Sequence, residues 1–475
     1  MTTAGGGNLP AMTTATAEIE IRDPATDEVV GRVRPAGPEE VDDAVGRAVA
    51  AGPDWARTDP GQRAGRVRDA ASALRAQAED LARLNETETG RPYDDGLGGV
   101  LAAAGTLEQY AELGPLHRGR SLQGSWSATD LMVPGPRGVV AAITPWNDPV
   151  AVAAGLIGAA LVTGNTVVHK PSERCPHLGR RVGDLLASFL PDGVLTVLDG
   201  GGETGALLCA HEGLDVIAHV GSIAAGRAIA EAAVGTGAKV LLENGGNDPL
   251  IVDDGVDPEW AAAQAALGSY ANGGQVCVSV ERIYCHRAIA DEFLAALAKE
   301  AGRWVYRPAQ EGEKALGPLV DARQREHVHG HVAEALAAGA TAHAGGELPD
   351  GAGSFYPATV LSGCTPDMRI LREETFGPVA PVRIVDSFSQ ALAEAVDDPH
   401  GLAATVLTPD MAHAQEAWRA LPVGTVKVNA VFGGAPGGAA EPRGLSGTGF
   451  GYGPELLDEM TTTKVVHLEA APPRR

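Results

Sequence analysis

The chain has 475 residues, more than a single hydrophobic core usually organises, so two or more packed lobes are expected. Apolar residues make up 44% of the sequence and charged residues 21%, which is ordinary for a soluble globular protein. The formal net charge of -24 argues against a nucleic-acid or anionic-membrane partner, because both would repel the protein, although plain solubility explains this charge equally well.

The first third of the chain predicts a hairpin, helices and a second pair of strands. Residues 17–36 alternate apolar and polar side chains and break at turn residues, which is typical of a hairpin. Residues 38–85 carry a long helical pattern that opens on a proline with acids in the first turn. Residues 127–147 resemble paired strands interrupted by a Pro-Gly turn.

Strand and helix patterns then alternate in two runs. Short β-branched segments that alternate with helices indicate βαβ units and a parallel sheet, so two α/β lobes fit the length. The tail at 460–470 is a lone strand candidate that needs a partner, which a neighbouring subunit could supply. The strands of the first run are expected at 138–144, 165–171, 193–199, 214–221 and 239–246, and those of the second at 249–254, 280–286, 380–386, 402–408 and 424–430.

The cysteines give no sign of a disulfide framework or a structural zinc site. They are odd in number and include no C-x-x-C pair, which fits a reducing compartment. The N-terminus lacks a basic region followed by an apolar run, and the apolar region at 138–168 is broken by prolines and polar residues. We therefore expect a cytoplasmic protein without a membrane span. The five cysteines are Cys175, Cys209, Cys277, Cys285, expected to face a core from a strand, and Cys364.

Two segments that follow predicted strands are candidates for binding a dinucleotide. Lys170 and Glu173 lie where a strand gives way to a loop and could each contact a ribose hydroxyl, although a solvated surface pair explains this segment better when it is taken alone. Gly221 and Ser222 end a strand and begin a helix, whose free N–H groups attract a phosphate. Neither this turn nor the Gly-rich turn at 199–205 is the G-x-G-x-x-G fingerprint, so the dinucleotide signal is incomplete.

Three further residues could carry catalysis, and each has a plain structural alternative. Cys277 follows Gly273 and Gly274, which let the chain turn sharply and bring a thiol close to a ligand, although most isolated cysteines are simply buried. Glu243 ends an apolar strand, where a raised pKa would suit a general base; the alternative is a charged residue that caps a turn. Asn147 lies between prolines and could donate to an oxyanion, or it is an ordinary turn residue.

Two histidines are rejected as a metal site. His327 and His331 are one helical turn apart, but there is no H-E-x-x-H motif and no evident third ligand. A solvated helix face explains the pair better, and no metal site is predicted.

The order and spacing of these motifs resemble the NAD(P)-dependent aldehyde dehydrogenase superfamily over almost the whole chain. The specificity of the resemblance comes from the number of matching segments and from their fixed order. The segments are P-W-N at 145–147, the Lys of H-K-P-S-E at Lys170, G-S at 221–222, E-N-G-G from Glu243, G-Q-V-C ending at Cys277, Arg282, and E-E-T-F-G-P-V at 373–379.

The resemblance implies an α/β fold with a Rossmann-type NAD-binding domain, a catalytic domain and a small β element for oligomerisation. The NAD-binding domain is expected at 15–117 and 137–244, and the catalytic domain at 245–445. The strands and tail of the oligomerisation element are expected at 118–136 and 456–475. The resemblance also implies a homodimer or homotetramer.

The resemblance also implies catalytic roles. Cys277 would attack the aldehyde carbonyl to give a thiohemiacetal, with Asn147 and the backbone N–H of Cys277 as the oxyanion hole. Hydride transfer to nicotinamide would leave a thioester, and Glu243 would activate the water that hydrolyses it. CoA-acylating relatives typically lack a carboxylate at this position, so Glu243 favours release of the free acid.

The cofactor that the resemblance implies is NAD, while NADP use stays open. The carboxylate of Glu173 would repel a 2′-phosphate, whereas Lys170 would tolerate one. The implied cofactor-binding residues are Trp146, Lys170, Ser172, Glu173, Gly202, Gly221, Ser222, Glu374 and Phe376.

The departures from the family pattern concern the substrate. Asn244 replaces an apolar residue beside the base, and Asp148 occupies a position that is often aromatic. Near the C-terminus the usual P-F-G-G block is missing, and Phe450 stands where arginine is usual. We expect an aldehyde-binding pocket formed by Asp148, Val276 and Val278, which would favour a polar or cationic aldehyde.

Two alternatives to an acid-producing aldehyde dehydrogenase stay open. One is a CoA-acylating semialdehyde dehydrogenase, which would need CoA for turnover. The other is an inactive homologue retained as a binding or structural protein. Asn244 and the altered C-terminal segment favour this second alternative.

Overall fold

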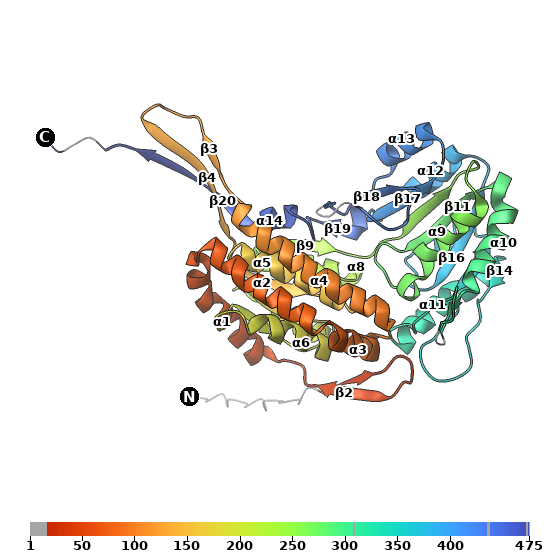
Figure 1. Cartoon of the computed structure of the whole chain (residues 1–475), viewed down its shortest axis with the longest axis horizontal. Helices are drawn as coiled ribbons and strands as arrows, with labels where there is room; N and C mark the ends of the chain where they lie inside the picture. Colours follow the sequence, from red (N-terminus) through yellow and green to blue (C-terminus); the bar gives the residue numbers. More distant parts are fainter. Residues whose placement is uncertain (1–16, 307–308, 435–437, 472–473, 475) are drawn as a thin grey trace, which may run out of the picture.

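The computed structural model describes residues 17–306, 309–434, 438–471 and 474. Two lobes, each with its own central sheet, lie side by side, and an antiparallel arm projects away from them (Figure 1). The α/β fold class is confirmed. Parts of three predicted segments lie outside the described residues, namely 15–16 of the NAD-binding domain, 307–308 and 435–437 of the catalytic domain, and 472–473 and 475 of the tail.

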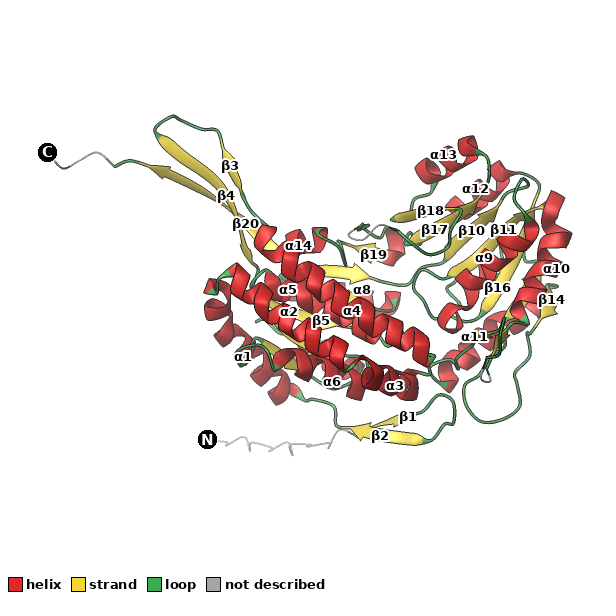
Figure 2. Cartoon of the chain, in the orientation of Figure 1, coloured by secondary structure: helices red, strands yellow, loops and turns green. Residues whose placement is uncertain are grey.

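The first lobe is a six-stranded sheet with helices on both faces (Figure 2). The order is β19-β9-β8-β5-β6-β7, and neighbours are parallel except β19 against β9. Val140 and Ala142 pack with α4 and α5, whereas Val139 and Ala141 pack with α1 and α8, because successive strand residues face opposite sides. The strands are β5 (Val139–Ile143), β6 (Thr166–Lys170), β7 (Leu195–Val197), β8 (Val216–Val220), β9 (Lys239–Glu243) and β19 (Gly447–Thr448). The helices are α1 (Pro38–Arg57), α2 (Pro60–Ala76), α3 (Ala78–Thr89), α4 (Tyr93–Leu113), α5 (Pro149–Val162), α6 (Pro176–Ala187), α7 (Gly202–Cys209), α8 (Ile223–Thr236) and α14 (Glu455–Glu459).

The helical stretch predicted at 38–85 is three helices rather than one. α1 ends at Arg57, and the carboxylate of Asp59 then caps α2 by accepting two backbone N–H groups of its first turn. Pro60 begins α2, and a proline has no N–H with which to continue the preceding helix. A second break at Gln77 separates α2 from α3.

The second lobe holds a seven-stranded sheet in the order β14-β15-β16-β11-β10-β17-β18, parallel except for β14 against β15. Leu250 and Val252 pack against α9 and α10, whereas Ile251 faces α12 and α13. Cys285 is buried in β11 and belongs to the α9 side of the core, as predicted. The strands are β10 (Asp248–Val252), β11 (Val280–His286), β14 (Thr341–Ala344), β15 (Thr359–Ser362), β16 (Val379–Val385), β17 (Ala403–Leu407) and β18 (Thr425–Val428). The helices are α9 (Pro258–Tyr270), α10 (Ala290–Ala301), α11 (Ala322–Ala337), α12 (Phe388–Val396) and α13 (Met411–Ala420).

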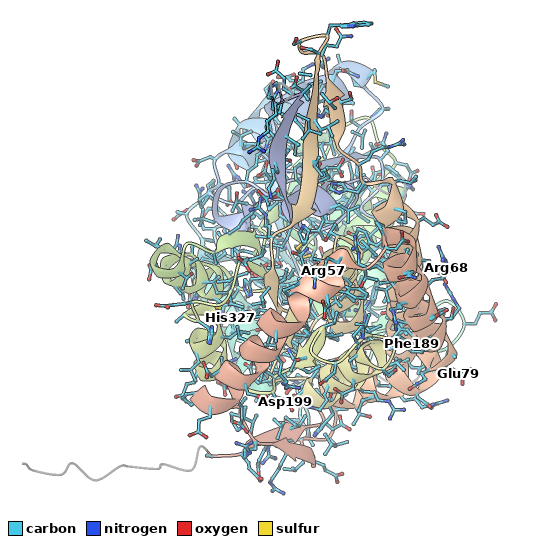
Figure 3. All side chains as sticks on the ribbon, turned by 90° about the vertical axis from the view of Figure 1, so that its left-hand side faces the viewer. Arg57, Arg68, Glu79, Phe189, Asp199 and His327 are labelled. Carbon is cyan, nitrogen blue, oxygen red and sulfur yellow. The ribbon has the colours of Figure 1, made fainter. Side chains whose placement is uncertain are left out.

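The arm is a three-stranded antiparallel sheet of β3 (Arg120–Leu122), β4 (Ala128–Pro136) and β20 (Thr461–Glu469). The tail strand therefore finds its partner within its own chain, pairing with β4 along its whole length. The side chains at the tip of the arm stand clear of the lobes (Figure 3). Several apolar side chains of the arm are exposed, namely Leu122, Trp126, Val133, Val465 and Leu468.

The prediction that residues 127–147 form one strand pair is wrong. β4 belongs to the arm, whereas β5 lies in the sheet of the first lobe. All five residues of β5 are buried, and its two edges pair with β6 and β8, so no edge is left for β4.

The predicted N-terminal hairpin is confirmed as β1 (Ile19–Arg22) paired with β2 (Val29–Val33). A small parallel pair, β12 (Trp304–Val305) and β13 (Lys314–Ala315), lies in the second lobe. Among the described residues, no helix has the length and apolar composition needed to cross a membrane.

Candidate active site

One cavity of about 740 Å³ is lined by residues of both lobes and lies at the carboxyl ends of β5, β6, β8 and β9. This edge of a parallel sheet is where such folds bind ligands. The cavity brings together every residue expected for catalysis or cofactor binding, which are Trp146, Asn147, Lys170, Ser172, Glu173, Gly202, Gly221, Ser222, Glu243, Cys277, Glu374 and Phe376.

Cys277 lies on a tightly folded loop between α9 and β11. Gly273 and Gly274 have φ of 65° and 72°, a left-handed conformation that glycine adopts without cost, so the chain turns sharply after α9 as predicted. The buried Gln275 holds the loop, because its side chain donates to Asn272 O at 3.0 Å and accepts from Val320 N at 2.9 Å. The thiol is thus presented to the cavity by a fixed backbone.

The thiol of Cys277 is protonated at neutral pH in the free protein. Burial, together with the nearby carboxyl groups of Asp248, Glu243 and Glu374, raises its pKa to about 12. Because a thiolate is the reactive form, the site needs either a base or a positive charge beside the sulfur during reaction.

Glu243 is the last residue of β9, and burial raises its pKa to about 7. Its Oε1 accepts the N–H of Gly451 at 3.0 Å. Gly447 of β19 pairs with Glu243, so the C-terminal segment closes over the carboxyl group. A Cβ at position 451 would lie only 2.3 to 2.7 Å from Glu243 side-chain atoms, so only glycine fits here. The result is a desolvated carboxyl group that can take up a proton near neutral pH.

Asn147 is fixed against the loop that carries Cys277. Its Nδ2 donates to Gln275 O at 3.1 Å, and its backbone carbonyl oxygen accepts from Arg91 Nη1 at 2.8 Å. The amide has a second N–H, because Nδ2 carries two hydrogens. A preorganised donor of this kind suits a developing negative charge beside Cys277.

Glu374 and Phe376 reach the cavity from the loop before β16. Glu374 Oε1 accepts the N–H of Gly246 at 3.0 Å, and burial raises its pKa to about 7. Phe376 has a φ of 52° and meets Trp146 edge-on, with ring centroids 5.6 Å apart. The buried carboxylate of Glu281 on β11 holds this loop by accepting the N–H groups of Thr375 and Phe376.

At the far end of the cavity, Lys170 is buried rather than solvated. Its Nζ donates to Pro171 O at 2.8 Å and Gly200 O at 2.7 Å, which leaves one of three N–H groups for a ligand. The expectation of a solvated surface pair is therefore wrong for this residue, because α7 and the β6 strand end enclose it. Ser222 caps α8 by accepting the N–H of Ala225, as predicted.

The comparisons decide the family. A family model described as the aldehyde dehydrogenase family matches residues 12–466. The chain belongs to this family. A 3,6-anhydro-alpha-L-galactose dehydrogenase of Vibrio sp. (strain EJY3) is 34% identical over 437 residues, covering 90% of this chain and 91% of the relative.

Solved aldehyde dehydrogenases match over the whole fold. A 3,6-anhydro-L-galactose dehydrogenase in complex with NADP has a TM-score of 0.92 and 32% identity, covering 96% of this chain and 97% of the other. A betaine aldehyde dehydrogenase of Staphylococcus aureus in complex with NAD+ has a TM-score of 0.91 and 30% identity, covering 96% and 93%. This aldehyde dehydrogenase is accordingly an oxidoreductase that acts on an aldehyde group.

The residues expected to recognise the aldehyde are not on the cavity wall. Asp148, Val276 and Val278 flank Asn147 and Cys277 along the chain but do not line the cavity. Asp148 Oδ1 lies 3.0 Å from Arg91 Nη1, so its charge is already paired. This ion pair offsets the charge on which the expectation of a polar or cationic aldehyde rests, and that expectation stays a prediction.

The two histidines of α11 are not on a solvated face, contrary to expectation. His331 is fully buried and its Nδ1 lies 3.1 Å from Thr375 Oγ1. His327, labelled in Figure 3, lines the cavity. The error arose because α11 packs against the loop that carries Thr375, which the local pattern does not reveal. No group of three or more metal-ligating side chains is present within the described ranges.

Two residues of the site escaped the sequence reasoning. Glu281 looks like an ordinary strand residue, and its only sequence signal is a lone acid inside an apolar strand. His219 lies on the cavity wall at the end of β8, and neither of its ring nitrogens has a hydrogen-bond partner among the described residues. Burial lowers the pKa of His219 to about 4, so the ring is neutral at pH 7.

Proposed function

We propose that this aldehyde dehydrogenase binds NAD in the cavity between its lobes and oxidises an aldehyde to the free carboxylic acid. The observation that carries the proposal is that a thiol, an amide donor and a carboxyl group with a pKa of about 7 all line the same dinucleotide-sized cavity. Cys277, Asn147 and Glu243 supply these groups.

Hydrogen-bonding groups that line the cavity and are available to a ligand support the binding of a dinucleotide. The N-terminus of α8 has backbone N–H groups available for a diphosphate, because Ser222 caps only part of its first turn. Lys170 retains one N–H for a ribose hydroxyl, and Glu374 offers a second acceptor near Cys277. When bound, the oxidised nicotinamide ring would supply a hydride acceptor and a positive charge beside the thiol.

In the first half of the reaction, Cys277 Sγ attacks the carbonyl carbon of the aldehyde. The oxygen that becomes negative accepts hydrogen bonds from Asn147 Nδ2 and from the backbone N–H of Cys277. The thiol proton leaves to solvent, because the positive charge of the bound nicotinamide would favour the thiolate of Cys277. Loss of hydride from the thiohemiacetal leaves a thioester on Cys277.

In the second half, water hydrolyses this thioester. Glu243 removes a proton from the attacking water, and the carbonyl oxygen again lies against Asn147. The C–S bond then breaks, which releases the carboxylic acid and returns the thiolate of Cys277. The N–H of Gly451 holds the Glu243 carboxylate in place between the two steps. A carboxyl base at this position is the feature that favours water over CoA as the acceptor.

NAD is favoured over NADP because of the charges at the ribose end. Glu173 and Lys170 both line that part of the cavity, and Glu173 would repel a 2′-phosphate. Lys170 donates two of its three N–H groups to backbone carbonyls, so only one N–H is left to bind a phosphate.

The arm supports a homodimer or homotetramer. It exposes several apolar side chains on a sheet that stands clear of the lobes, and an exposed apolar strand surface of this kind is a pairing surface for another chain. The unpaired state of all five cysteines supports a reducing compartment such as the cytoplasm.

The experiment is a mixed panel of aldehydes incubated with protein and NAD, followed by NADH absorbance, with and without CoA. Acid production with NADH formation that does not depend on CoA is the expected result. Turnover only with CoA would favour the acylating alternative, and no NADH with any aldehyde would favour an inactive homologue.

A further inference from the structure

Lys427 lies on β18, the edge strand of the second sheet, and its side chain faces the α9 side of that sheet. Val426 packs into the core beneath α12 and α13, so Thr425 and Lys427 must point to the opposite face. The contact with Phe432 agrees, because Lys427 Nζ lies 5.6 Å from the centre of that ring, which packs against the core beneath α9 and α10.

The beginnings of neighbouring strands connect β18, which carries Lys427, to the loop that carries Cys277. The Cys277 loop leads into β11, where Val280 pairs with Asp248 at the start of β10. Asp248 Oδ1 accepts the N–H of Ala403, which begins β17, and Ala403 pairs with Thr425 at the start of β18. A continuous row of strand beginnings therefore connects the loop of the nucleophile to the strand of Lys427.

Lys427 makes no ion pair in the part of the chain that the structure describes, and burial lowers the pKa of its ammonium group. The charges of Asp248 and Cys277 act on that pKa in the opposite direction. Burial raises the pKa of Asp248 well above its ordinary value, which favours the neutral form of that carboxyl group.

Two hydroxyl groups accompany this ammonium group. The side chain of Thr425 forms a hydrogen bond with the phenol of Tyr452. The charges of Glu243 and Cys277 act on the same phenol. None of Thr425, Lys427 and Tyr452 lines the cofactor cavity, although Cys277 and Glu243 do. Lys427 acts electrostatically on Cys277, and Tyr452 on Cys277 and Glu243, so these donors lie near the nucleophile and outside the lining of the cofactor cavity.

We propose that Lys427, with the hydroxyls of Thr425 and Tyr452, binds a carboxylate at the far end of the substrate, so that the enzyme acts on aldehydes that carry a carboxylate group. This inference rests on the proposed function and names its substrate class. An ammonium group and two hydroxyls match the acceptor oxygens of a carboxylate. The paired state of Asp148 is consistent with this class, since no uncompensated carboxylate is left there to repel an anion.

The test compares aldehydes with four-carbon chains whose terminal groups are anionic, neutral or cationic. These are 4-oxobutanoate, butanal and 4-(trimethylammonio)butanal, each assayed with NAD in the wild type, Lys427→Met, Lys427→Arg and Lys299→Met. Lys299 is an exposed lysine on α10 of the same lobe and serves as the matched control. Binding of succinate in the presence of NADH, measured by calorimetry, reports on the carboxylate site without turnover.

The wild type should favour 4-oxobutanoate over butanal in kcat/KM by about tenfold or more, the factor expected for a hydrogen-bonded charge pair. Lys427→Met should remove this preference and weaken succinate binding while butanal oxidation is kept, and Lys427→Arg and Lys299→Met should keep the preference. Equal rates for 4-oxobutanoate and butanal, a preference for the cationic aldehyde, or a preference that survives Lys427→Met would overturn the inference while the proposed function stands. No NADH from any of the three aldehydes would count against both.

Discussion

Replacing Glu243 by Gln should make the protein more stable at alkaline pH, because the base is held in an environment that disfavours its charge. Glu243 is enclosed by the C-terminal segment, and burial raises its pKa from 4.5 to about 7. Gln is uncharged and can still accept the N–H of Gly451 through its amide oxygen. The substitution therefore removes the cost of the buried charge and keeps the hydrogen bond.

The size of the effect follows from the two pKa values. A carboxyl group whose pKa is raised from 4.5 to about 7 loses about 3 kcal/mol of folding free energy once it is ionised in both states, and this is an upper bound. The folded state binds the proton more tightly than the unfolded state, so the wild type loses stability as pH rises from about 4.5 to about 7. The Glu243→Gln variant does not lose this folding stability, because glutamine does not ionise.

The assay is thermal unfolding of wild type and Glu243→Gln at pH 5 and pH 8.5, with Asp254→Asn on an exposed loop as a control. The Glu243→Gln variant should match the wild type at pH 5 and exceed it at pH 8.5, while the control shows no such pH-dependent gain. A difference that is independent of pH, or a Glu243→Gln variant that is less stable at pH 8.5, would refute the reasoning.

Four further predictions concern the chemistry. Cys277→Ala should abolish NADH formation while NAD binding, measured by calorimetry, stays intact; remaining turnover would exclude Cys277 as the nucleophile. Asn147→Ala should lower kcat by about 100-fold or more through loss of an oxyanion donor, with little change in the KM for NAD, and an unchanged kcat would remove that role. Gly451→Ala should disturb the Glu243 carboxyl and lower steady-state turnover more than the first burst of NADH, because its Cβ would lie 2.3 Å from that side chain; equal losses in both phases would contradict this. In the wild type, the rate of thioester hydrolysis should rise with pH through about 7, as Glu243 becomes ionised, and a rate that is flat from pH 5 to 9 would argue for another base.

The sequence was enough to predict the alternating α/β pattern, because the strand and helix periods are local. Cys277, Glu243 and Asn147 were named as a set only through the resemblance of motif order and spacing, because each residue taken alone had a plain structural alternative. Their convergence in one cavity could not be derived from any single segment, and came only from their order along the chain.

The errors came from contacts between distant segments. Residues 127–147 were expected to form one strand pair, whereas β4 pairs with the distant tail strand β20 and β5 lies inside the sheet of the first lobe. His331 was placed in solvent because its own helix shows nothing of the loop around Thr375 that covers it.

The central claim is that a thioester forms on Cys277 and that Glu243 is needed to hydrolyse it. The most direct measurement is mass spectrometry of Glu243→Gln after mixing with NAD and an aldehyde that the wild type oxidises. The account predicts one equivalent of NADH per site and an acyl group of the substrate's mass on the peptide that contains Cys277. NADH formation without an acylated Cys277 peptide, or acylation of a different cysteine, would contradict it.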